Sequence, residues 1–171
     1  MDKDLENTFL NALEEHQHKL LRICSVYAQD DDDTKDLFQE VLVNIWKAMP
    51  SFKENSAIGT WMYKITLNVC LRLKTKEIRK QKKLLRMDSR AINIYKTEVM
   101  DDGQYEQREQ LVQLRTCIRK LNEADKAVIT LYLEELPYKE ISSITGLTEN
   151  NIAVKIKRIK KKLLNCLRPT S

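Results

Sequence analysis

Residues 137–164, PYKEISSITGLTENNIAVKIKRIKKKLL, decide the fold of the C-terminal part of the chain. Apolar residues recur at steps of three and four on both sides of a short break, which predicts a short helix, a turn and a longer helix. Gly146 can take the positive φ of a sharp turn, Leu147 fills the space between the helices, and Thr148 can cap the second helix. This spacing predicts a helix-turn-helix unit.

The longer helix of this unit has two different faces. Its apolar face is expected to pack inward, whereas the opposite side presents amides and cations that suit base edges and phosphates in a DNA major groove. We call this side the C-terminal reading face; it consists of Thr148, Asn150, Asn151, Val154, Lys155, Lys157, Arg158 and Lys161, with Lys160 at its edge. A helical hairpin with a solvated basic face is the alternative interpretation.

Three further amphipathic helices are predicted in the N-terminal half. Apolar side chains recur at helical spacing over residues 5–27, over residues 34–49, and from a Ser56 cap onward into the basic stretch 74–83. The four aspartates at 30–33 separate the first two helices, and their carboxylates favour the N-terminus of the second. Three helices with short connections predict an antiparallel bundle.

The whole chain is expected to be all-α, with two small helical domains joined by a flexible linker. Three glycines and three prolines in 171 residues leave too few turns for a β-sandwich or barrel. The N-terminal bundle occupies residues 1–85, and the apolar periodicity is lost over residues 86–104, which we interpret as the linker. Four helices, one of them capped by Asn122, form the C-terminal domain at residues 105–171.

Several classes of protein are disfavoured by what the sequence lacks. No apolar run is long enough to span a membrane, and the first residues do not resemble a signal peptide, so we expect a soluble cytoplasmic protein. A Gly-rich phosphate loop and a nucleophile–base pair are both missing, so we expect no enzyme and no cofactor. His16 and His18 point to different sides of a helix and cannot hold one metal ion together.

The four cysteines, Cys24, Cys70, Cys117 and Cys166, are spread widely along the chain. This spacing fits neither a paired-cysteine metal site nor a dense disulfide framework. Each cysteine has apolar neighbours at helical spacing, so we expect reduced thiols packed in the core.

Positive charge is concentrated in two separate blocks. Residues 61–90 carry 10 basic and 2 acidic side chains, and residues 138–171 carry 8 and 2, whereas the stretches before each block are net acidic. Two basic blocks of this kind indicate two contacts with a polyanion.

The first basic block carries a polar stripe along the third predicted helix. We call it the N-terminal stripe; it consists of Lys64, Asn68, Arg72, Thr75 and Arg79, spaced three or four residues apart. The loop at residues 52–56 and Trp61 place aromatic and amide groups beside these cations, as an unstacked base in a single strand requires. A solvated basic stripe, with Trp61 as a core aromatic, remains the alternative.

Short motifs in both halves resemble known regions of bacterial sigma factors. In the N-terminal half, five motifs resemble the second conserved region of these factors: DLFQEV at 36–41, IW at 45–46, SF at 51–52, TWMYKI at 60–65 and Asn68. In the C-terminal half, four segments resemble the fourth region: LNE at 121–123, LYLE at 131–134, YKEI at 138–141 and the helix at 152–158. A short chain with these two regions alone is similar to the extracytoplasmic-function group, and the resemblance covers about residues 33–80 and 115–165.

The resemblance implies a transcription initiation factor that binds core RNA polymerase and promoter DNA. The implied polymerase-binding residues, which would meet the largest subunits, are Asp36, Gln39, Glu40 and Asn44. The residues implied near the melted minus-10 strand are Phe52, Asn55, Ser56, Trp61 and Asn68, and those implied to hold phosphates are Lys64, Arg72, Lys76 and Arg79. The C-terminal reading face would bind the minus-35 element, the linker would follow the RNA path, and an anti-sigma factor is a further implied partner.

The resemblance is incomplete in the last helix. Ala153 and Val154 stand where many relatives have an arginine and a small polar residue, so their base preference does not transfer to this chain. Ile159 replaces a common alanine, which we expect to alter packing only. Two other functions stay open: a stand-alone helix-turn-helix regulator with a sensing or dimerising N-terminal bundle, and a metal-dependent nuclease built on the aspartates at 30–33.

Overall fold

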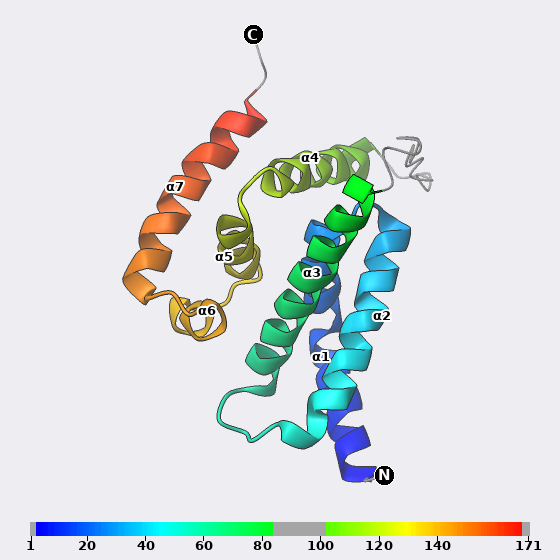
Figure 1. Ribbon diagram of the computed structural model, residues 1–171. Helices are drawn as coiled ribbons and strands as arrows, with labels where there is room; N and C mark the ends of the chain where they lie inside the picture. The colour runs from blue at the N-terminus through cyan, green and yellow to red at the C-terminus, as the bar shows by residue number, and fades with distance from the viewer. Residues whose placement is uncertain (1–2, 84–101, 169–171) are drawn as a thin grey trace.

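The computed structural model describes residues 3–83 and 102–168, and the side chains of residues 3–74 and 106–168 (Figure 1). Every regular element in these ranges is helical, so the all-α prediction is confirmed. The elements are α1 (Lys3–Tyr27), α2 (Asp31–Ala48), η1 (Met49–Ser51), α3 (Ile58–Lys83), α4 (Asp102–Arg119), α5 (Glu123–Leu133), α6 (Tyr138–Thr145) and α7 (Glu149–Leu167). The predicted linker at 86–104 lies largely outside the described residues, so the division into domains stays a prediction.

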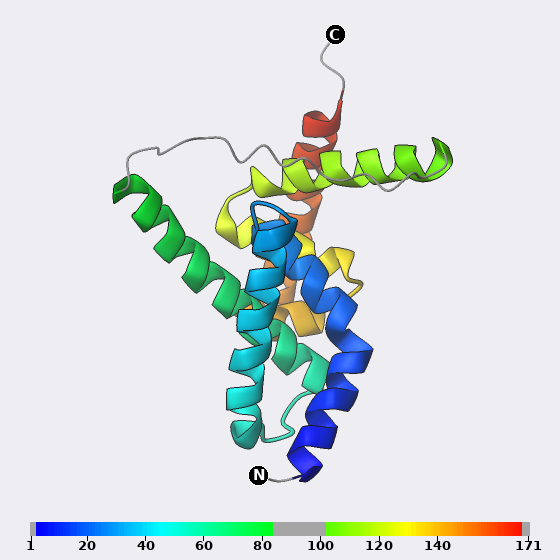
Figure 2. The same cartoon turned by 90° about the vertical axis from the view of Figure 1, so that its right-hand side faces the viewer.

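The helices α1, α2 and α3 form the N-terminal bundle (Figures 1 and 2). Its centre is fully buried and apolar, with Leu20, Ile23, Val41, Ile45 and Met62. Burial of five large side chains supplies the main driving force, because each contributes about 1.5–3 kcal/mol relative to an exposed position.

Local hydrogen bonds fix where the bundle helices begin. The Asp30 carboxylate accepts a hydrogen bond from the Asp33 N–H at 2.7 Å, so Asp30 is the N-cap that the aspartate run predicted. The helix therefore starts at residue 31, three residues before the expected start. The prediction that Ser56 caps α3 is wrong by one residue, because the Ala57 carbonyl accepts the first helical bond, from the Trp61 N–H.

The C-terminal helices confirm the predicted helix-turn-helix unit. Gly146 has φ 81°, in the left-handed region that glycine tolerates without steric cost, and it ends α6. The Thr148 hydroxyl accepts from the Asn151 N–H at 3.1 Å and caps α7, and Asn122 caps α5 as expected. The apolar side of α7 is buried, at Ile152, Ile156 and Ile159.

The state of the cysteines differs from the expectation that all four are reduced. Cys117 and Cys166 form a disulfide that joins the last turn of α4 to the last turn of α7, so the prediction of four reduced thiols is wrong for this pair. The two residues are 49 positions apart, and only the crossing of the two helices brings them together. Cys24 and Cys70 are free and fully buried, as expected.

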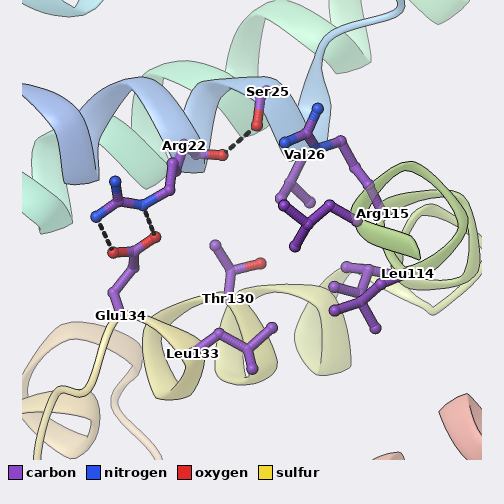
Figure 3. A pocket seen from close by; sticks show the side chains of 10 residues that line it. Arg22, Ser25, Val26, Leu114, Arg115, Thr130, Leu133 and Glu134 are labelled. Carbon is purple, nitrogen blue, oxygen red and sulfur yellow. Dashed lines mark hydrogen bonds and ion pairs between the residues drawn. The ribbon is translucent and has the colours of Figure 1, made fainter. Parts of the chain in front are cut away.

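The C-terminal helices pack against the N-terminal bundle. Figure 2 shows α4 lying across the C-terminal end of α1, while α5 and α6 contact α1 and α3 respectively. The Arg22 guanidinium donates two hydrogen bonds of 2.7 Å to the Glu134 carboxylate, beside a cavity of about 260 Å³ (Figure 3). This hydrogen bonding raises the pKa of Arg22 above its ordinary value.

Two further contacts support this packing. The Arg119 guanidinium donates to the Ser25 carbonyl at 2.8 Å, and the Lys126 ammonium lies 5.4 Å from the centre of the Tyr27 ring. In Figure 1, α7 lies on the far side of α4–α6 from the bundle, so the face of α7 that turns away from these helices is open to solvent.

Candidate nucleic-acid and polymerase interfaces

The described part of the N-terminal stripe lies on the solvent side of α3. Lys64, Asn68 and Arg72 are all exposed, one turn apart. The Asn68 amide has no hydrogen-bond partner among the described residues, so it is free to pair with a base edge. The side chains of Thr75 and Arg79, the other two members of the stripe, and of Lys76 lie outside the described residues.

An aromatic pair stands at the start of this stripe. The Phe52 and Trp61 rings lie 4.9 Å apart between centroids at 43°, and both are half-buried. Asn55 and Ser56, in the intervening loop, are exposed. Trp61 packs against the core and still keeps part of its ring accessible, so the two interpretations of this residue are compatible. A half-exposed ring beside cations is a suitable surface for stacking a base.

The predicted polymerase-binding residues share one face of α2. Asp36, Gln39 and Glu40 are exposed, and Asn44 is half-buried one turn further on. The Asn44 amide donates to the Glu40 carbonyl at 2.7 Å, and its oxygen lies 3.4 Å from an Arg72 nitrogen. This acidic face therefore adjoins the N-terminal stripe.

The C-terminal reading face is exposed along most of its length. The exposed members are Thr148, Asn150, Asn151, Val154, Lys157, Arg158 and Lys161. Val154 is an apolar residue at the centre of this face, with 43% of its surface exposed. An exposed aliphatic group at this place can contact a thymine methyl group.

Two lysines of α7 form ion pairs with Asp125 of α5. The Lys155 ammonium lies 3.1 Å from one Asp125 oxygen, and the Lys162 ammonium lies 3.5 Å from the other. The Asp125 side chain is only 8% exposed, so its charge is compensated by the reading helix. The sequence pattern did not reveal Asp125, because its partners are 30 and 37 residues away.

Lys160, at the edge of the reading face, also has a partner. Its ammonium donates to the Tyr132 hydroxyl at 2.9 Å and lies 4.7 Å from the centre of that ring. The hydrogen bond with Tyr132 raises the pKa of Lys160 above its ordinary value. Lys155 and Lys160 thus help to hold α7 against α5.

A histidine that the sequence left without a role joins α1 to α3. His16 Nδ1 and the Tyr63 hydroxyl lie 2.8 Å apart, and burial raises the pKa of Tyr63 to about 12.

Within the described ranges, no three His, Cys, Asp or Glu side chains gather closely enough to hold a metal ion. None of the helices in residues 3–83 and 102–168 has the length and apolar character that a bilayer crossing requires.

The described residues thus combine an exposed polar stripe on α3 with a helix-turn-helix at α6 and α7, in an all-helical protein. A family model described as Sigma-70 region 2 matches residues 12–83, and one described as Sigma-70, region 4 matches residues 111–163. The chain belongs to the sigma-70 family of transcription initiation factors, in the extracytoplasmic-function group.

Known proteins of this family are similar to almost the whole chain. RNA polymerase sigma factor SigV of Bacillus subtilis is 26% identical over 153 residues, 89% of this chain and 86% of SigV. The ECF RNA polymerase sigma-E factor of Escherichia coli K12 is 27% identical over 168 residues, 90% of this chain and 83% of that factor. The sigma factor RpoE of Bartonella quintana, solved with the anti-sigma factor NepR, has the same fold, with a TM-score of 0.69, 20% identity and coverage of 97% and 98% of the two chains.

Proposed function

We propose that this chain, as a sigma factor, directs core RNA polymerase to promoters through two DNA-reading surfaces. The N-terminal stripe takes the minus-10 element as a melted strand, and the C-terminal reading face takes the minus-35 element as a duplex. The observation that carries this proposal is the presence, in one chain, of an exposed cation–amide stripe on α3 and an exposed amide–cation face on α7. The fold by itself does not specify function, so the proposal depends on the chemistry of these exposed side chains.

At the minus-35 element, α7 enters the major groove with its N-terminal half. Asn150 and Asn151 offer amides to adenine edges, and Arg158 offers a planar fork to guanine. Lys157 and Lys161 neutralise phosphates, so binding weakens as salt rises. Lys155 and Lys160, which are bound to α5, orient the helix, and they can contact phosphates only after release from those partners.

At the minus-10 element, the N-terminal stripe captures a strand that has left the duplex. Unstacking a base costs a few kcal/mol, which stacking on an aromatic ring and hydrogen bonds in a pocket must offset. Phe52 and Trp61 supply the rings, with Asn55 and Ser56 in the adjoining loop. Asn68 can donate and accept at once, so it is the group nearest to a flipped base in this proposal. The phosphates are held by Lys64, Arg72, Lys76 and Arg79.

The exposed acidic face of α2 is the proposed contact with the largest polymerase subunits. The chemistry of RNA synthesis then belongs to the polymerase, and this chain needs no catalytic residue or cofactor of its own. Because the polymerase works in the cytoplasm, the same location is proposed for this chain. RpoE of Bartonella quintana was solved with an anti-sigma factor, and we infer that an anti-sigma factor also regulates this chain.

Reconstitution with core polymerase tests the polymerase contact. Replacing Asp36, Gln39 and Glu40 by alanine should reduce co-purification and run-off transcription, while helix content measured by circular dichroism stays constant. Replacing Glu6 and Glu14, two exposed acidic residues of α1, is the matched control and should leave both unchanged. Unimpaired co-purification of the triple variant would refute the assignment. Promoter-specific duplex binding by the chain alone, without any response to polymerase, would instead indicate a stand-alone regulator.

Asn68→Ala tests the minus-10 assignment. The variant should impair promoter opening, seen by permanganate footprinting, while polymerase binding and duplex binding by α7 remain. A pre-melted bubble should restore part of the activity and widen tolerance of the base that Asn68 reads. Lys64→Ala is the control: it should weaken binding to all minus-10 sequences alike, because it removes a phosphate contact. Since the Asn68 side chain is exposed, the melting temperature should not change, and normal opening by the variant would end this assignment.

A further inference from the structure

Cys117 and Cys166 differ in accessibility although they share a disulfide. Cys166 lies in the last turn of α7 and is exposed, whereas Cys117 in α4 is only 6% exposed. Their Cα atoms are 6.0 Å apart, within the ordinary range for a disulfide, so the bond can form without movement of the two helices. An accessible sulfur with a shielded sulfur next to it is the arrangement in which oxidation ends in a disulfide.

The other two cysteines provide an internal comparison. Cys24 and Cys70 lie in the core of the N-terminal bundle, where both are 0% exposed. The hydrogen bond with Cys70 and burial together raise the pKa of the Cys24 thiol above its ordinary value. A buried thiol that stays protonated reacts slowly with oxidants, so these two cysteines are expected to remain reduced.

We propose that Cys117 and Cys166 form a reversible thiol-oxidation site, with hydrogen peroxide as oxidant, that fastens the reading helix to α4. Cys166 is the sulfur that meets the oxidant, because it is the exposed member of the pair. Cys117 is the resolving sulfur, because it lies beside Cys166 and is shielded from solvent. Small dithiols reverse the reaction by exchange at the exposed sulfur.

The oxidation is balanced in two steps. The Cys166 thiolate attacks one peroxide oxygen, the O–O bond breaks, and the hydroxide that leaves takes a proton to become water, which produces a sulfenic acid on Cys166. The Cys117 thiolate then attacks the Cys166 sulfur, the S–O bond breaks, and a second hydroxide leaves as water. Two thiols and one hydrogen peroxide thus give one disulfide and two waters.

The position of the bond determines what oxidation changes. The 49-residue separation encloses α5, α6 and nearly all of α7, so the ring contains the whole helix-turn-helix. The exposed groups of the C-terminal reading face lie at residues 148–161, before the bonded end of α7, so the bond leaves them accessible. Oxidation therefore stabilises the unit that carries the reading face by restricting its unfolded state.

Thiol mapping of the full chain tests the site directly. The chain is reduced with dithiothreitol, freed of reductant, treated with hydrogen peroxide, denatured and labelled with a maleimide. All four cysteines should be labelled before peroxide; after peroxide only Cys24 and Cys70 should be labelled, with one peptide cross-link between residues 117 and 166. Four labelled cysteines after peroxide, a cross-link between other residues, or Cys166 oxidised without a cross-link would each overturn the proposal.

Thermal unfolding tests the consequence. The oxidised chain should melt roughly 10 °C or more above the reduced chain, and dithiothreitol should remove the difference. Cys166→Ser should melt at one temperature with or without peroxide, whereas Cys24→Ala, which keeps the pair, should retain the peroxide-dependent shift. Equal melting temperatures of the oxidised and reduced wild-type chain would overturn the fastening role. These readouts involve neither polymerase nor DNA, so they succeed or fail independently of the promoter-recognition proposal. Only the DNA-binding role of α7 rests on that proposed function.

Discussion

The ion pair between Arg22 and Glu134 joins the N-terminal bundle to the C-terminal helices. Two hydrogen bonds of 2.7 Å join the guanidinium to the carboxylate in a bidentate arrangement (Figure 3). The Glu134 side chain is 9% exposed and the Arg22 side chain 54%. We therefore predict that Arg22→Ala loosens the packing of the two parts, because it leaves a buried carboxylate without a partner.

The size of the effect follows from the unequal burial of the two groups. A hydrogen bond to a charged group contributes about 1.5–3 kcal/mol, and exposed ion pairs contribute about 0.2–1 kcal/mol. Solvent screens the half-exposed Arg22, so the bidentate pair should fall between these two classes, at about 1–1.5 kcal/mol of coupling free energy. Arg22→Ala alone should cost somewhat more, because it also leaves Glu134 unpaired and desolvated.

A double-mutant cycle isolates this coupling. The free energy of urea unfolding is measured for wild type, Arg22→Ala, Glu134→Gln and the double variant, and small-angle scattering follows the radius of gyration. Arg115→Ala is the matched control, because Arg115 lines the same cavity but forms no ion pair with Glu134. The radius of gyration should rise for Arg22→Ala and stay constant for the control. A coupling free energy below about 0.5 kcal/mol, with unchanged scattering, would refute this account of the interface.

Two other predictions concern α7. Arg158→Ala should cost about 1–3 kcal/mol on the correct minus-35 duplex and relax one base position, whereas Lys157→Ala should weaken all sequences alike and reduce the salt slope by about 1. Competition between specific and scrambled duplexes measures both, and equal losses for Arg158→Ala on the two duplexes would contradict base recognition. Asp125→Asn should lower the free energy of unfolding by about 1–3 kcal/mol, because Lys155 and Lys162 lose their shared carboxylate. Thermal unfolding checks this, and an unchanged midpoint would show that the pairs contribute nothing.

The features that the sequence predicted well are those that depend on residues close together in the chain. Asp30 and Thr148 act as N-caps because their side chains reach a backbone N–H three residues away. Gly146 ends α6 because few other residues tolerate its φ. Apolar periodicity placed the long helices for the same reason, since the period depends only on which side of a helix is buried.

The features that the sequence did not predict depend on contacts between distant segments. The Cys117–Cys166 disulfide and the pairing of Arg22 with Glu134 join residues 49 and 112 positions apart. Nothing in the local pattern distinguishes Cys117 from the buried Cys24, since both lie among apolar neighbours. Helical periodicity indicates that a side chain faces a partner but not which helix supplies the partner.

The internal partners of α7 narrow the set of residues available for the DNA recognition that we propose. The sequence placed Lys155 in the reading face and Lys160 at its edge, yet in the structure Lys155 is bound to Asp125 and Lys160 to Tyr132. The groups that remain exposed, among them Asn150, Arg158 and the other free members of the face, recur at steps of three and four and therefore form one narrow strip. Because Lys155 and Lys160 are held by α5, rotation of α7 about its axis would break the Lys155–Asp125 ion pair and the Lys160–Tyr132 hydrogen bond. These two contacts thus fix the rotation of α7, and with it the angle at which the strip would meet a DNA groove in the proposed complex.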